Sequence, residues 1–192
     1  KFISIESVDK MLKQSDSISI KLVKRDLNLK GIEKIIIKNS FISSVDVSLE
    51  LNGELGVRFV EKEPVFRVLN DDYYIDLSGS IMPLSENYSE RIPLILSEVN
   101  STELKSLGML GNYFKNDIFF SNHITGLEII DNEFLFHVNN FKYLIKMKDL
   151  SDFKSRFNNY KVFYKTVIND SILVKLKSIN LNFKNQVIVQ KR

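Results

Sequence analysis

The sequence predicts an α+β fold built from two parts. Apolar residues recur at helical spacing before residue 37, alternating runs flank Asn52-Gly53, and short strand-like runs dominate after Pro64. The chain has 192 residues, of which 44% are hydrophobic and 27% are charged, which is typical of a globular protein. This length allows one large domain or two small ones.

Two amphipathic helices are predicted at the start of the chain. Ser4 and Asn28 are both residue types that cap helices, because their side chains accept hydrogen bonds from the first helical N–H groups. Apolar residues follow each cap at helical spacing: Ile5, Val8, Met11 and Leu12 after the first, and Leu29, Ile32, Ile35 and Ile36 after the second.

A β-hairpin is predicted next. Apolar residues alternate over 45–51 and again over 55–59, and Asn52-Gly53 lies between the two runs. This arrangement favours a two-residue type I′ turn, in which both residues adopt positive φ. The order helix, helix, strand, strand then ends at Pro64.

The chain after Pro64 is predicted to be mostly β-structure. Two helices are expected within it: a loose and mobile one over 101–114, which Gly108 and Gly111 weaken, and a stronger one that Ser151 caps. Strands are expected at 65–69, 73–76, 92–96, 124–130, 133–138, 141–147, 178–183 and 186–190, with a turn at Asp131-Asn132.

The composition disfavours several classes of function. Lys and Arg number 27 against 24 Asp and Glu, and the two signs are interspersed, so no nucleic-acid surface is predicted. Cys is absent, and the two His residues are far apart, which argues against thiolate chemistry and a His-rich metal or catalytic site. The chain has no Gly-rich phosphate-binding loop and no Gly-x-Ser-x-Gly motif. We therefore predict no enzymatic activity and no cofactor.

Two groups of carboxylates leave alternatives open. Asp71, Asp72 and Asp76 offer oxygen ligands for a hard cation, but they lack the Gly and the distal Glu of an EF-hand loop, so a solvated turn is favoured. Glu61 and Glu63 share one strand face and could act as an acid–base pair. A cryptic hydrolytic enzyme would require Glu61, Glu63 and Asp76 to converge in one cleft.

The last predicted strand favours a binding function. Val187 and Val189 lie on one face of it, Ile188 lies on the other, and Lys191-Arg192 follow. A C-terminal strand can lie at a sheet edge and pair with a strand from a partner. The alternative is that the two terminal cations prevent such pairing.

Several segments, taken in order, carry a family resemblance. They are Asn28-Leu29, residues 40–47, the Glu-Lys-Glu-Pro segment at 61–64, the Ile-Asp-x-x-Gly hairpin within 73–85, the Arg-Phe helix at 156–164 and the closing strand at 179–187. Together they resemble the extracytoplasmic region of the bacterial cell-division family FtsQ/DivIB. Four positions depart from the family pattern: Ser40 replaces Pro, Lys62 replaces Arg, and Asn180 and Asn182 replace Asp and Arg.

The resemblance implies a fold and a function. Residues 1–64 would form a POTRA domain (β-α-α-β-β) without its first strand, and residues 65–192 a β domain with an extended antiparallel sheet and helices. The family is a non-enzymatic divisome scaffold. Its members bind the FtsB–FtsL complex by strand addition and help recruit and regulate septal peptidoglycan synthesis. Carried over by position, the partner-binding residues are Asn182, Phe183, Asn185, Gln186, Val187, Val189 and Lys191, with Phe183 as the anchor.

The resemblance also implies a location. No apolar stretch reaches the roughly 18 residues that span a bilayer, and the chain begins at Lys1, so we expect a longer protein with a single membrane anchor upstream. This region would lie outside the cytoplasmic (inner) membrane, in the periplasm or its equivalent, at the septum. The POTRA part could bind another divisome protein. The alternative function is a POTRA-bearing outer-membrane assembly or secretion component that binds β-strand clients.

Overall fold

The computed structural model describes residues 2–3, 6, 28–86 and 88–192. The chain forms two compact units, one of residues 1–63 with 82–89, and the other of residues 64–81 with 90–192. Both helices and strands are present, which confirms the predicted α+β class. The predicted helix after Ser4 lies outside the described residues.

The first unit contains helix α2 (Leu29–Ile36) and a hairpin of strands β1 (Ile42–Leu49) and β2 (Leu55–Glu61). The helix begins as predicted, because the side chain of Asn28 accepts a hydrogen bond from the N–H of Gly31 at 3.0 Å. Its buried face packs on β1 in a small apolar core of Ile32, Ile36, Ile42 and Val47.

The turn of this hairpin differs from the prediction. Beyond the last paired residues, Leu49 and Leu55, the N–H of Glu50 donates to the carbonyl of Glu54 at 2.8 Å and the N–H of Gly53 donates to the carbonyl of Glu50 at 2.9 Å. The loop is therefore longer than two residues, and only Gly53 in it has positive φ. The side chain of Asn52 accepts a hydrogen bond from the N–H of Glu54 at 2.9 Å, which stabilises the wider loop. The prediction of a two-residue type I′ turn at Asn52-Gly53 is therefore wrong.

The second unit is organised around a nine-stranded sheet with the order β11-β10-β9-β8-β7-β6-β3-β4-β5, although residues 82–83 of β5 are grouped with the first unit. The strands are β3 (Pro64–Val68), β4 (Tyr73–Asp76), β5 (Ile81–Pro83), β6 (Leu94–Ile95), β7 (Ile124–Ile130), β8 (Glu133–Val138), β9 (Leu144–Met147), β10 (Leu176–Asn180) and β11 (Ile188–Lys191). Asp131 and Asn132 both have positive φ between the paired residues Ile130 and Glu133, so the predicted turn at this position is confirmed.

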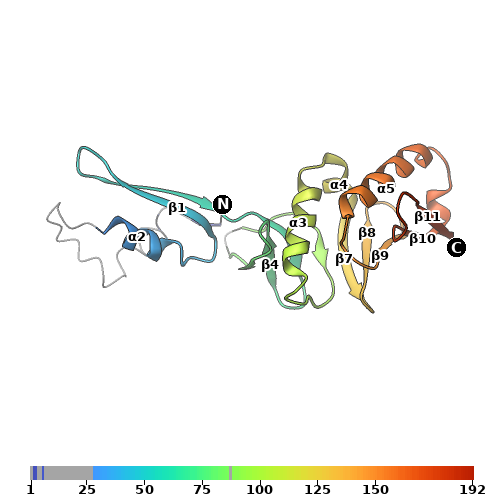
Figure 1. The fold of residues 1–192 in the computed structure, drawn as a ribbon, viewed down its shortest axis with the longest axis horizontal. Helices are drawn as coiled ribbons and strands as arrows, with labels where there is room; N and C mark the ends of the chain where they lie inside the picture. The colour runs from blue at the N-terminus through green and yellow to red at the C-terminus, as the bar shows by residue number, and fades with distance from the viewer. Residues whose placement is uncertain (1, 4–5, 7–27, 87) are drawn as a thin grey trace. The chain divides into compact units, whose positions relative to one another are not determined.

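The sheet is mixed, and the expectation of an antiparallel sheet is wrong for three pairs. Strands β3 and β6, β6 and β7, and β9 and β10 run parallel. Parallel neighbours need a long crossover connection, which is usually helical. Helices α3 (Leu104–Lys115) and α4 (Ile118–His123) connect β6 to β7, and α5 (Phe153–Val167) connects β9 to β10 (Figure 1).

Four buried phenylalanine rings join the three helices to the sheet. Phe114 of α3, Phe120 of α4, Phe136 of β8 and Phe157 of α5 are each at most 1% exposed. The ring of Phe157 meets the rings of Phe114 and Phe136 edge-on, with centroids 4.9 and 5.1 Å away. All three helices therefore cover the same face of the sheet as Phe136.

Helix α4 was not predicted, although its start carries a sequence signal. The side chain of Asp117 accepts hydrogen bonds from the N–H groups of Phe119 and Phe120, as an N-cap does. Lys161 of α5 also contacts this carboxylate, at 2.5 Å. Burial alone would raise the pKa of Asp117, but these hydrogen bonds hold it below its usual value.

The helix that Ser151 was expected to cap, α5, begins after Asp152 instead.

The two glycines of α3 have a packing role that the sequence did not reveal. A Cβ atom on Gly111 would lie 2.5 Å from the side chain of Val65, and one on Gly108 would lie 2.5 Å from the backbone nitrogen of Gly79. The glycines thus let α3 approach the β3–β4 hairpin and the turn after it. They indicate close packing of the helix, whereas the sequence-based prediction treated them only as weak points.

Gly108→Ala is expected to destabilise the protein, although the same change at an open helix position stabilises it. The new methyl group would meet backbone atoms, so we expect a loss of about 2 kcal/mol in the free energy of unfolding. Urea denaturation would measure it. Lys105→Ala, at an exposed position of the same helix, is the control and should change stability by less than about 0.5 kcal/mol. Equal stability of Gly108→Ala and the native protein would contradict this packing role.

Candidate partner-binding edge

The last strand, β11, lies at one edge of the nine-stranded sheet. It pairs with β10 in an antiparallel register that sets Ile188 opposite Asn180 and Val189 opposite Ile179. Figure 1 shows β10 and β11 together beside the C-terminus. The predicted edge position of the C-terminal strand is therefore present in the fold.

The outer side of β11 presents backbone groups. The N–H of Arg192 donates to the carbonyl of Lys175, the residue before β10, over 3.0 Å. Because alternate residues of a strand direct their backbone groups to the same side, Gln190 and Ile188 also face β10. The N–H and C=O groups of Val189 and Lys191 consequently point away from the sheet.

The apolar residues of the candidate edge fall into two groups, one partly buried and one exposed to solvent. Val187 and Val189 are partly buried and pack against the main core, so their side chains anchor β11 to the unit. Ile188, on the opposite face, is 44% exposed, and Phe183 in the β10–β11 turn is 52% exposed. The structure thus brings an exposed aromatic ring and an exposed aliphatic side chain to the same hairpin as the outward backbone groups.

Asn182 has a clear structural partner. Its side-chain oxygen accepts a hydrogen bond from the N–H of Lys148, just past β9, at 2.6 Å. Its own N–H donates to the side chain of Asn180 at 2.8 Å. The two asparagines that replace Asp and Arg of the family pattern therefore stabilise the turn after β10.

The remaining predicted residues lie around the turn and at the strand end. Asn185 has φ of 58°, in the left-handed region that Asn tolerates well. Gln186 closes the turn with an N–H bond to the carbonyl of Phe183 at 3.3 Å. Lys191 is exposed at the far end of β11. A polar pocket lies beside the turn, lined by Asp152, Ser155, Arg156, Asn159, Asn182, Lys184 and Asn185.

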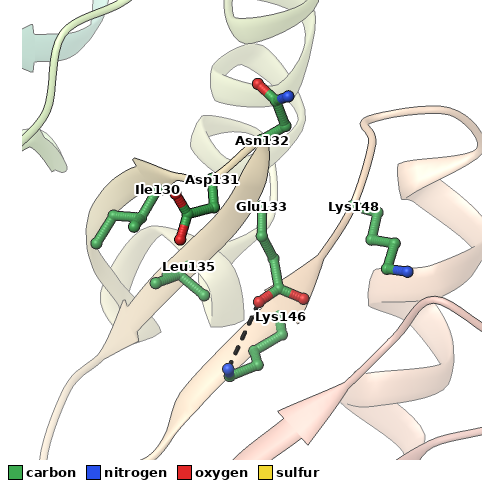
Figure 2. A pocket seen from close by; sticks show the side chains of 7 residues that line it. All are labelled: Ile130, Asp131, Asn132, Glu133, Leu135, Lys146 and Lys148. Carbon is green, nitrogen blue, oxygen red and sulfur yellow. Dashed lines mark hydrogen bonds and ion pairs between the residues drawn. The ribbon is translucent and has the colours of Figure 1, made fainter.

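A second hollow lies on the side of the sheet that the helices leave uncovered. It is lined by Ile130, Asp131, Asn132, Glu133, Leu135, Lys146 and Lys148 (Figure 2). Figure 2 shows Glu133 and Lys146 pointing toward each other, and their charged atoms are 3.5 Å apart. Charges of both signs share this open hollow, which has neither a nucleophile with a base nor a set of convergent carboxylates.

The carboxylates of the enzyme alternative have local structural partners. Asp76, only 4% exposed, accepts hydrogen bonds from the N–H groups of Ser78 and Ser80 and from the hydroxyl of Ser78. Glu61, in the other unit, accepts bonds from the N–H groups of Phe2 and Ile3. Asp76 therefore holds a turn together, and the description of it as solvated is wrong. Within the described residues, no group of three His, Cys, Asp or Glu side chains is arranged to hold a metal ion.

The two histidines have different environments. His137, on strand β8, has its ring nitrogen Nε2 2.8 Å from the carboxylate of Glu128. His123 is buried and lies 2.5 Å from the hydroxyl of Tyr160, which is 2.7 Å from the hydroxyl of Tyr143. Burial lowers the pKa of His123 to about 4 and raises the pKa of Tyr143 to about 12. This chain of buried polar groups links α4, α5 and the residue before β9 within the core.

His123 should make stability depend on pH. An unfolded chain protonates histidine near pH 6.5, whereas the folded protein does so only near pH 4, so its contribution is complete above pH 6.5 and is lost as pH falls toward 4. At about pH 5 this loss amounts to about 2 kcal/mol. Between about pH 7.5 and pH 5, the free energy of unfolding of the native protein should fall by about 2 kcal/mol more than that of His123→Gln, as measured by urea denaturation. Parallel pH profiles of the two proteins would contradict the assignment.

Comparison with protein families gives a match over most of the chain. A family model described as FtsQ/DivIB, C-terminal related, matches residues 63–190. Comparison with curated protein sequences gives no match. Among the described residues, no helix combines the length and the apolar character needed to cross a membrane.

Proposed function

Because the chain belongs to the FtsQ/DivIB C-terminal related family, a family of non-enzymatic cell-division scaffolds, we propose that it binds the FtsB–FtsL complex at the edge strand β11. Binding occurs by strand addition, and the scaffold thereby helps recruit and regulate septal peptidoglycan synthesis. The proposal concerns association between proteins and includes no chemical step on a substrate.

The position of β11 is the observation that carries this proposal. An edge strand with outward N–H and C=O groups at Val189 and Lys191 offers hydrogen bonds to an extended segment of a partner. Since those groups are backbone groups, pairing itself depends little on side-chain identity. Selectivity therefore has to come from the neighbouring side chains.

Phe183 and Ile188 supply the apolar part of the contact. They are 52% and 44% exposed and lie at the turn and on the open face of the hairpin. Exposed aromatic side chains at the centre of an interface commonly contribute most of the binding energy. Val187 and Val189, which pack on the core, hold the strand in place while the partner binds.

The first unit and the location complete the proposal. The order of helix α2 and hairpin β1–β2 in the first unit supports its assignment as the second helix and the last two strands of a POTRA domain, and we propose that this domain binds a further divisome protein. A membrane anchor upstream would place both units outside the cytoplasmic membrane at the septum. The family match over residues 63–190 favours this function over an outer-membrane assembly component.

Phe183→Ala should weaken binding of the cognate FtsB extracytoplasmic segment. Loss of an anchoring aromatic ring costs about 2 kcal/mol or more, which is about a 30-fold increase in Kd. Isothermal titration calorimetry would measure it. Ile118→Ala, which removes a side chain that is 85% exposed on α4, is the control and should leave Kd unchanged. An unchanged Kd for Phe183→Ala would refute the role of this residue.

Val189→Pro should block strand addition while β10–β11 pairing persists. Proline removes an N–H that points away from β10, and edge strands tolerate proline at such positions. We expect Kd for FtsB to rise at least about tenfold with a folded protein by circular dichroism. In contrast, Gln190→Pro removes an N–H that faces β10 and should lower thermal stability. Full affinity of Val189→Pro would show that partners do not pair with this edge.

A further inference from the structure

The net positive charge of the protein lies in residues 171–192, the segment that contains its last hairpin. Residues 171–192 contain five Lys and Arg residues and no Asp or Glu, out of 27 and 24 in the whole chain. The other residues therefore contain 22 basic and 24 acidic side chains and carry a small negative charge. The formal net charge of +3 thus comes entirely from the hairpin segment.

Four of these cations gather at one end of β11. Lys191 is paired with Leu176 across the ladder, and the backbone of Arg192 bonds to that of Lys175 at 3.0 Å. Lys177 lies in the irregularity of β10 between Leu176 and Ser178. The fifth cation, Lys184, lies in the turn at the other end of the hairpin.

The four side chains are available to a partner. Lys175, Lys177, Lys191 and Arg192 are all exposed. Within the described part of the chain, none of them forms an ion pair, whereas cations elsewhere, such as Lys146 and Lys161, do. Four unpaired like charges on or next to the adjacent strands β10 and β11 repel one another and attract a negative partner.

We propose that this cationic cluster, defined as Lys175, Lys177, Lys191 and Arg192, selects an acidic segment in the partner that pairs with β11. The segment would carry its Asp and Glu residues at the end of the added strand that lies beside Lys191. The inference rests on the strand addition proposed above. It adds a charge requirement that fixes which end of the partner strand meets which end of β11.

A peptide fits this site better than an anionic lipid surface does. The cations flank outward N–H and C=O groups at Val189 and Lys191, which an extended peptide can satisfy and a lipid headgroup array cannot. The exposed Ile188 and Val174 lie close to the cluster along the chain, at 44% and 70% exposure. Backbone groups and an apolar side chain along β11 thus combine with positive charge at the end of the strand that carries Lys191.

Exposed charges at the rim of an interface act mainly on the association rate. The test is therefore stopped-flow or surface-plasmon-resonance kinetics with the cognate FtsB extracytoplasmic segment, alone and with FtsL, at low and high salt. The variant carries Lys175→Gln, Lys177→Gln, Lys191→Gln and Arg192→Gln. The matched control removes four exposed lysines elsewhere: Lys30→Gln, Lys34→Gln, Lys38→Gln and Lys105→Gln.

We expect the cluster variant to associate about tenfold more slowly at low salt, with a weaker dependence of the rate on salt, and the control to stay within about twofold of the native protein. An FtsB segment with its Asp and Glu changed to Asn and Gln should bind the native protein as slowly as the native segment binds the variant. Equal rates for variant and native protein would overturn the charge requirement and leave strand addition intact.

Two further outcomes would also overturn the inference. If the native chain binds neither FtsB nor FtsB with FtsL, the strand-addition function and the charge requirement both fail. If the cluster variant keeps the native association rate but loses binding to phosphatidylglycerol vesicles that the native chain binds, the cluster serves a lipid surface. Circular dichroism of every variant would confirm that the fold is retained.

Discussion

The contact among Phe114, Phe120, Phe136 and Phe157 determines the architecture of the second unit. These rings come from three helices and one strand, and their mutual distances of 4.9 to 6.1 Å leave them nearly without solvent exposure. Each ring contributes a large apolar area and an edge-to-face contact, so the helices are held to one side of the sheet. The other side keeps polar pairs such as Glu128 with His137.

The position of the edge follows from this arrangement. After β9, the chain forms helix α5, which packs Phe157 into the aromatic cluster, and then forms β10, which pairs parallel to β9. The short turn after Asn180 then reverses the chain into β11, which joins the outer side of β10. The strand order places no other element of the described sheet beyond β11. A crossover followed by a hairpin therefore creates an edge, and Val187 and Val189 fix it to the core.

Features set by neighbouring residues could be predicted from the sequence, and features set by distant contacts could not. Asn28 caps α2, and Asp131-Asn132 turn between β7 and β8, because each depends on local backbone chemistry. The parallel strand pairs depend on contacts between distant segments, and the role of Gly108 depends on the backbone of Gly79.

For the candidate site, Phe183 and the edge position of the last strand could be proposed from the residues and the family resemblance. The cationic cluster was missed because charges counted over the whole chain nearly cancel, whereas a count over residues 171–192 would have revealed it.

An exposed edge strand has to pair with the right partner and avoid pairing with itself. Sequence alone left two interpretations of Lys191-Arg192, one as part of a binding strand and one as a barrier to pairing. The structure makes these two interpretations compatible, because both cations lie at the end of β11 with Lys175 and Lys177 beside them. A second copy of the chain would bring its own cations to the edge and be repelled, as in other protected edges. An acidic segment would instead be attracted, so one set of charges opposes self-association and favours a complementary strand.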